Sequence, residues 1–108
     1  MDDQCAILNV RDKGLVIVTG CGHAGIVNII RNAQALTGVQ QVYAVVGGFH
    51  LTGPLFERII PDTVAALQQF DPRYLMPGHC TGWAATLQLA HAMPDAFIAN
   101  SVGTTLVL

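Results

Sequence analysis

Three of the four histidines, His23, His50 and His79, occupy equivalent places in the amino-acid sequence. Each follows a short apolar run with glycine, and each is followed by a segment that resembles a helix. In an open α/β sheet, ligands bind beside the carboxyl ends of the strands. Neutral imidazole is a common metal ligand, and catalytic zinc often has three protein ligands and an open position for water. The pattern therefore predicts that these three histidines bind zinc or another divalent metal.

The loop from Gly20 to Gly25 has the spacing G-x-G-x-x-G between a predicted strand and a predicted helix. One interpretation is a phosphate- or nucleotide-binding loop, in which Gly20, Gly22 and Gly25 let a phosphate approach the helix N-terminus. The acid that a dinucleotide site needs after the next strand is absent, because the first acid beyond the loop is Glu57. A second interpretation is a tight turn that lets strand and helix pack closely, and a third is a turn that presents His23.

The cysteines and the fourth histidine give weaker signals. Cys80 directly follows His79 and points another way in extended chain, which favours a small buried hydrophobe over a ligand. Cys21 lies near a predicted helix N-terminus, where a reactive thiol is the alternative to a structural one. His91 is expected in the last turn of a helix, where it is structural or exposed. The acids form no pair suited to general acid–base catalysis, so the catalytic residues stay unknown.

The elements that would position the histidines are read from apolar runs and helical spacing. Strands are expected at residues 5–10, 15–19, 41–46 and 74–76, with a last pair at 97–99 and 104–108. A helix from about residue 26 should end at Gly38, and another should begin with Pro61 in its first turn. A third is expected over residues 82–93, with Thr81 as its N-cap. A hairpin followed by αβ units predicts an α/β fold with right-handed crossovers.

The composition predicts one α/β domain over residues 1–108 with an apolar face against a partner. Hydrophobic residues make up 52% of the chain and charged residues 11%, against about 25% charged in an ordinary globular domain. Buried parallel strands account for part of this apolar excess. A second copy of the chain on one face would account for the rest, so we expect a homodimer.

Charge and cysteine content exclude several classes of partner. The net charge is −2 and the five basic residues form no cluster, which argues against nucleic-acid binding. No apolar run is long enough to span a bilayer, and the acidic N-terminus is unlike a secretory signal, so no membrane partner is expected. Three cysteines without a C-x-x-C pair favour a reducing compartment, and we expect a cytoplasmic protein.

Three motifs resemble those of metallo-β-lactamase-fold hydrolases, in the branch related to dihydropterin–ribofuranosylaminobenzene phosphate synthase. They read TGCGHAGIVN, GGFHL and PGHCTGW, and begin at Thr19, Gly47 and Pro77. The resemblance runs over nearly the whole chain and corresponds to the C-terminal half of the family fold, an αββα sandwich with a one- or two-metal site, usually zinc. By similarity, His23 matches a ligand of the first metal and His79 a ligand of the second. His50 lies where most members place a bridging aspartate.

The resemblance also implies a missing part, because the His-x-His-x-Asp-His motif of the family's N-terminal half does not occur in this sequence. We expect half of the sandwich, a mixed sheet with helices on one face, completed by a second copy through a twofold axis. A complete two-metal site cannot form within one such chain. A separate chain that supplies the missing half is an alternative source of ligands.

Three functions remain open from the sequence. The first is a truncated metallo-hydrolase-like protein that binds one zinc-class ion and hydrolyses a small ester, phosphoester or lactone by metal-activated water. The second is a non-catalytic dimerisation or ligand-binding module that retains the fold. The third is a phosphate- or nucleotide-binding module that uses the loop from Gly20 to Gly25.

Overall fold

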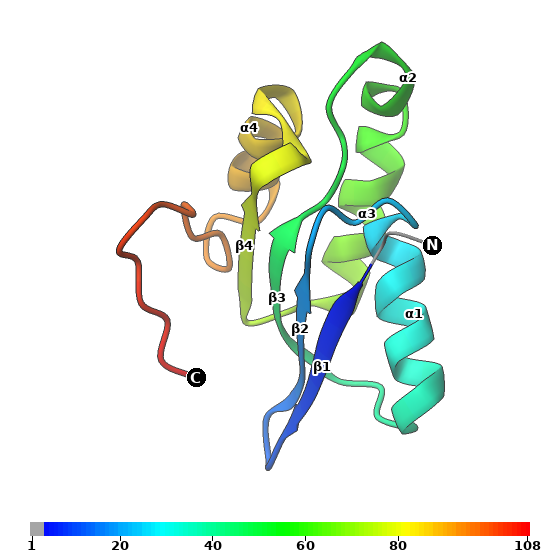
Figure 1. The fold of residues 1–108 in the computed structure, drawn as a ribbon, viewed down its shortest axis with the longest axis vertical. Helices are drawn as coiled ribbons and strands as arrows, with labels where there is room; N and C mark the ends of the chain where they lie inside the picture. The colour runs from blue at the N-terminus through cyan, green and yellow to red at the C-terminus, as the bar shows by residue number, and fades with distance from the viewer. Residues whose placement is uncertain (1–3) are drawn as a thin grey trace.

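The computed structural model describes residues 4–108, with the side chain of His79 outside the described part. Four strands form one mixed sheet in the order β1-β2-β3-β4 (Figure 1). The strands are β1 (Cys5–Val10), β2 (Gly14–Thr19), β3 (Val42–Gly48) and β4 (Tyr74–Gly78). The first two form an antiparallel hairpin, whereas β2, β3 and β4 run parallel to one another. The hairpin and the two αβ units follow the order that the sequence predicts.

One face of the sheet packs against the helices. The long helices are α1 (Ile26–Thr37), α3 (Ile60–Phe70) and α4 (Trp83–Ala92), and the short ones are α2 (Pro54–Glu57) and η1 (His79–Thr81). Side chains of Ile17, Val45 and Leu75 from three strands join Ile30 of α1 and Leu67 of α3 in one buried core. The buried residues of α1 and α3 recur at the spacing of one helical face, which is why these two helices lie on this side. The predicted mixed sheet with helices on one face is confirmed.

Local signals set the ends of these elements. The helix α1 ends at Gly38, whose left-handed φ of 73° and bond from its backbone N–H to the Gln34 carbonyl complete the last turn. Pro61 lies in the first turn of α3, where its missing N–H costs no hydrogen bond. Both features are as predicted from the sequence.

The second face of the sheet is apolar, and within residues 4–108 no helix packs on it (Figure 1). Because side chains alternate along a strand, the neighbours of the core residues point to this side. On this face Leu8 of β1 lies opposite Val16 of β2, and Val18 of β2 lies opposite Val46 of β3. Val16 is buried, but Leu8 is 51% exposed and Val18 is 42% exposed. The C-terminal segment runs past β4 on the side away from α1 (Figure 1).

The C-terminal part of the chain departs from the prediction in two ways. Phe97 forms only an isolated bridge with Leu75, and residues 104–108 form no strand, so the expected last pair of strands is wrong. Gly82, not Thr81, is the N-cap of α4, and no side chain caps that helix. The Thr81 hydroxyl instead donates to the Gly78 carbonyl at 2.8 Å. The local sequence favoured Thr81 as the N-cap of α4, but the hydrogen bond to Gly78 already uses its hydroxyl.

Within residues 4–108, every helix is too short or too polar to cross a lipid bilayer.

Candidate metal centre

His23 and His50 meet at the carboxyl edge of the sheet. His23 follows β2 and His50 follows β3, and these two strands are parallel neighbours with Thr19 opposite Gly47. The loops that carry the histidines therefore leave the sheet at the same edge. The two imidazole rings are edge to face, with ring centroids 4.4 Å apart and an angle of 71° between their planes. The structure thus brings together two of the three predicted metal ligands.

Backbone contacts hold the two loops against each other. The N–H of Gly48 donates to the carbonyl of Gly20 at 2.8 Å. Gly22 has a positive φ of 75°, and a Cβ built on it would lie 2.4 Å from the Gly48 carbonyl oxygen. No side chain fits at that position without moving the backbone. The turn interpretation of the glycine loop therefore has a direct physical basis at Gly22.

A third contact fixes the loop of His50 from the opposite side. The backbone N–H of Phe49 donates to the hydroxyl of Thr81 at 3.2 Å, and Thr81 is 1% exposed. Phe49 is itself buried in the core. His50 then adopts a left-handed φ of 50°, which is unusual for a non-glycine residue. Such a conformation persists only where the surrounding structure determines it.

The Nδ1 atom of His50 is buried and has no hydrogen-bond partner among the described residues. A buried polar nitrogen without a partner costs about 1–3 kcal/mol, so it requires an explanation. The ring of Phe56 lies edge to face against the His50 ring, with centroids 4.7 Å apart. A nitrogen lone pair in these surroundings suits coordination of a cation, and the neighbouring His23 ring offers a second nitrogen donor. The residues present therefore fit part of a divalent-metal site.

A small cleft opens beside the two histidines. Its volume is about 280 Å³ and its lining includes His23, His50, Phe56, Ile59 and Thr63. Apart from the two imidazoles, its walls are largely apolar, as expected for a pocket that positions a ligand by a few polar groups.

His79 lies at the same edge of the sheet by its backbone. It is the first residue of η1 and directly follows β4, whose Gly78 pairs with Gly48 at the end of β3. Its side chain lies outside the described part, so its predicted role as a ligand stays a prediction. Among the described side chains, no cluster of three or more His, Cys, Asp or Glu residues is placed to hold a metal.

The phosphate-binding interpretation of Gly20, Gly22 and Gly25 also stays a prediction. Gly25 is the N-cap of α1, and no side-chain hydrogen bond caps this helix. Its N–H donates to the carbonyl of Gly22 at 3.0 Å, which closes the turn before the helix. The strand β3 ends in glycines and carries no acid for a ribose hydroxyl.

Cys21 and Cys80 meet beside the histidines, which sequence reasoning missed. The thiol of Cys80 donates to the carbonyl of Cys21 at 2.8 Å, although the two are 59 residues apart. Cys80 is partly exposed rather than a buried hydrophobe. Burial raises the pKa of its thiol and the neighbouring Cys21 thiol raises it further, whereas the backbone of His50 lowers it. The available signal was that each cysteine lies within two residues of a histidine at a strand end.

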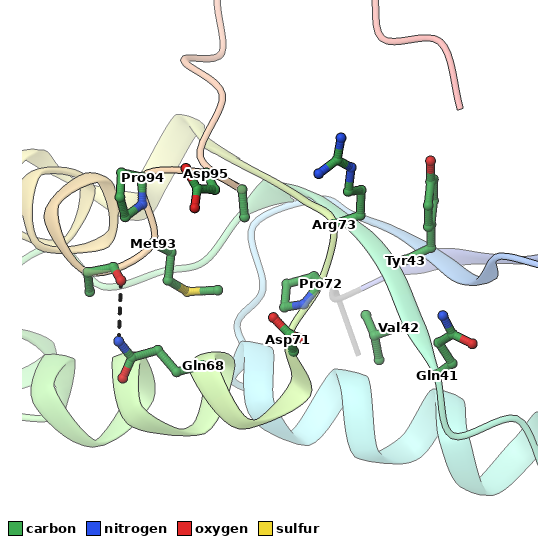
Figure 2. Close-up of a pocket in the computed structure, with 12 residues that line it drawn as sticks. Gln41, Val42, Tyr43, Gln68, Asp71, Pro72, Arg73, Met93, Pro94 and Asp95 are labelled. Atoms are coloured by element: carbon green, nitrogen blue, oxygen red, sulfur yellow. Dashed lines mark hydrogen bonds between the residues drawn. The ribbon is translucent and has the colours of Figure 1, made fainter.

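The fourth histidine and a second, larger cavity lie elsewhere. His91 is in the last turn of α4 and is exposed, as predicted. A cavity of about 550 Å³ lies near the amino ends of β3 and β4, where Tyr43 and Arg73 line it together with Asp71 and Asp95 (Figure 2). It contains no histidine or cysteine. We therefore place the candidate site at the carboxyl edge, where α/β sheets bind ligands.

Known proteins resemble this chain in sequence or in structure. The chain is 41% identical over 85 residues to 7,8-dihydropterin-6-methyl-4-(β-D-ribofuranosyl)-aminobenzene-5′-phosphate synthase of Methanocaldococcus jannaschii, covering 79% of this chain and 29% of that protein. It is 32% identical over 88 residues to the uncharacterized protein MJ0448 of the same organism, covering 82% of this chain and 32% of that protein. The crystal structure of Tm1679, a metal-dependent hydrolase of the β-lactamase superfamily, matches with a TM-score of 0.79 and 28% identity.

The structural match covers 94% of this chain but 39% of the Tm1679 chain. The chain likewise spans 29% and 32% of the two curated relatives. No family model matches the sequence. The similarity therefore concerns one part of these larger proteins.

Proposed function

We propose that the chain is part of a metallo-β-lactamase-superfamily protein and that it supplies nitrogen ligands to the divalent-metal site of a hydrolase. The observation that carries this proposal is the buried Nδ1 of His50, which has no partner among the described residues and lies beside the ring of His23. Zinc is the first candidate, because imidazole nitrogen is among its preferred ligands. The substrate class that we propose is a small ester, phosphoester or lactone.

The chain's own residues would bind and shield such a site. A divalent ion, when bound, lowers the pKa of its water and so supplies a nucleophile near neutral pH. His23 and His50 would hold the ion from two adjacent strand ends. Phe56 packs against the His50 ring and excludes water from one side of it. The bonds from Gly48 to Gly20 and from Phe49 to Thr81 keep the two imidazoles in place.

Further ligands must complete the proposed site. Catalytic zinc usually has three protein ligands, and the described side chains supply two. His79 is the first candidate for the third, because its backbone lies at the same edge of the sheet. The His-x-His-x-Asp-His run of the family does not occur in residues 1–108, so ligands of that kind would lie outside these residues.

We also propose that a second copy covers the open face of the sheet. Leu8 and Val18 expose apolar side chains on this face, and no helix covers them. A twofold axis would bring two such faces together and bury both sheets. The result would be a homodimer with two layers of sheet between two layers of helices.

A non-catalytic module is the competing function. It is favoured by the lack of a cluster of three or more potential ligands among the described side chains. In that case the fold would be retained without metal-dependent chemistry. The two functions differ in whether the protein binds a metal through its histidines.

Elemental analysis of protein purified without chelators separates these functions. We expect zinc, iron or manganese near one ion per chain in the native protein and much less in His23→Ala. His50→Asn is a second variant, because asparagine tolerates the left-handed backbone at this position. His91→Ala is the matched control, since His91 is exposed and lies on another helix. Native protein that is free of metal and refuses added zinc would overturn the proposal.

A further inference from the structure

Two cysteines from distant parts of the chain lie in direct contact. The Cys80 thiol donates to the backbone carbonyl of Cys21 at 2.8 Å. Cys21 belongs to the loop between β2 and α1, and Cys80 belongs to η1. The contact therefore joins two loops that the fold brings to one edge of the sheet.

A glycine leaves the space in which the cysteines meet. A Cβ built on Gly48 would lie 2.8 Å from the Cys80 sulfur and 3.1 Å from the Cys21 Cα atom. Both cysteines are thus packed over the end of β3, and no side chain from that strand separates them. Both are also partly exposed, so a small reagent in solution can reach them.

We propose that Cys21 and Cys80 are an oxidisable pair that forms an intramolecular disulfide on reaction with a low-molecular-weight disulfide. All three cysteines are thiols in the structure. Neither metal binding nor hydrolysis uses this pair, so the proposal stands apart from the function proposed above. Cys5 is the natural reference, because it is exposed on β1 and forms no part of the pair.

The reaction proceeds by two thiol–disulfide exchanges. One protein thiolate attacks a sulfur of the small disulfide, the small S–S bond breaks, and one small thiol leaves. The second protein thiolate then attacks the protein sulfur of this mixed disulfide, and the second small thiol leaves. Two protein thiols are oxidised to one disulfide, and one small disulfide is reduced to two thiols.

The disulfide would tie together the loops beside the candidate metal centre. Cys21 lies two residues before His23, and Cys80 directly follows His79. The bond would close a long loop of the chain, which restricts the unfolded state and raises the melting temperature. The oxidised protein should therefore melt several degrees higher than the reduced protein.

Glutathione buffers with a graded ratio of oxidised to reduced form provide the test. Free thiols are blocked with iodoacetamide at each ratio, and the protein is then analysed by mass spectrometry. Trypsin separates the three cysteines into different peptides, 1–11, 14–31 and 74–108. We expect a disulfide between the second and third peptides to form as the share of oxidised glutathione rises. The ratio of oxidised to reduced glutathione at which it forms should be at least about ten-fold lower than the ratio at which Cys5 is glutathionylated.

Two variants make the result decisive. Cys5→Ser should form the same cross-link, because the exposed Cys5 takes no part in it. Cys21→Ser should form no cross-link and should leave Cys80 as a thiol or a mixed disulfide. Native protein that carries glutathione separately on Cys21 and Cys80, or that forms only links between molecules, would overturn the proposal.

Discussion

The imidazole rings of His23 and His50 lie edge to face with centroids 4.4 Å apart, although each follows a different strand. This contact depends on the parallel pairing of β2 with β3 and on the bond between Gly48 and Gly20. Beside it, the Nδ1 of His50 is buried without a partner among the described residues. The proposed metal-binding role would explain why the fold keeps a polar atom in this position.

Zinc affinity should depend strongly on His23. The side chain is exposed, so His23→Ala should leave the stability of the metal-free protein nearly unchanged. Zinc affinity should fall by about 100-fold or more. Even the loss of a residue that only hydrogen-bonds to a metal ligand lowers metal affinity by about 10- to 100-fold. Competition with a chromophoric chelator measures the affinity. His91→Ala should bind zinc as the native protein does, and equal affinity of His23→Ala would remove His23 from the site.

The close approach of two loops should make Gly22 intolerant of a side chain. Gly22 and Gly38 have nearly the same φ, at 75° and 73°, but only Gly22 faces a backbone oxygen within 2.4 Å. Gly38→Ala should cost about 1 kcal/mol in the free energy of unfolding, from backbone strain alone. Gly22→Ala should cost at least about 2 kcal/mol more, because the loop of Gly48 must move. Urea unfolding of both variants measures the difference, and equal costs would contradict the role of this contact.

The buried hydroxyl of Thr81 should stabilise the loop that carries His50. It accepts from the Phe49 N–H and donates to the Gly78 carbonyl. Thr81→Val keeps the shape but leaves both backbone groups without this partner, so the free energy of unfolding should fall by about 1–3 kcal/mol. Thr81→Ser retains the hydroxyl and should lose less. Thermal unfolding compares the two variants, and the same loss in both would indicate packing rather than hydrogen bonding.

Strong local signals account for what the sequence predicted. The hairpin, α1 with Gly38 at its end, and α3 with Pro61 in its first turn depend on residues close together in the chain. The position of His23 and His50 at one edge followed from a general property of parallel strands. These features can be predicted without knowing the order of the strands in the sheet.

Long-range contacts account for what the sequence did not predict. Thr81 looks like a helix cap from its neighbours alone, but its hydroxyl is shared with Phe49, which follows another strand. The contact between Cys21 and Cys80 likewise depends on the packing of two loops over Gly48. Residues 97–99 and 104–108 have strand-like composition, yet this part of the chain joins the sheet only by an isolated bridge at Phe97, whose neighbours Ala96 and Ile98 bond to Leu75.

The open face of the sheet should control the oligomeric state. We expect a dimer by light scattering at micromolar concentration, because Leu8 and Val18 would otherwise keep apolar surface in water. Leu8→Lys places a charge on the proposed contact face, on the edge strand β1, where lysine is tolerated in the monomer. The dimer dissociation constant should rise at least about ten-fold, which corresponds to about 1.4 kcal/mol.

The matched control for this prediction is Leu36→Lys. Leu36 is 71% exposed on α1, so it carries a similar apolar surface on a different element. This variant should leave the dimer unchanged, because α1 packs on the other face of the sheet. A native protein that stays monomeric at micromolar concentration would contradict the dimer. If both substitutions weakened the dimer equally, the contact between the two copies would not be specific to the open face.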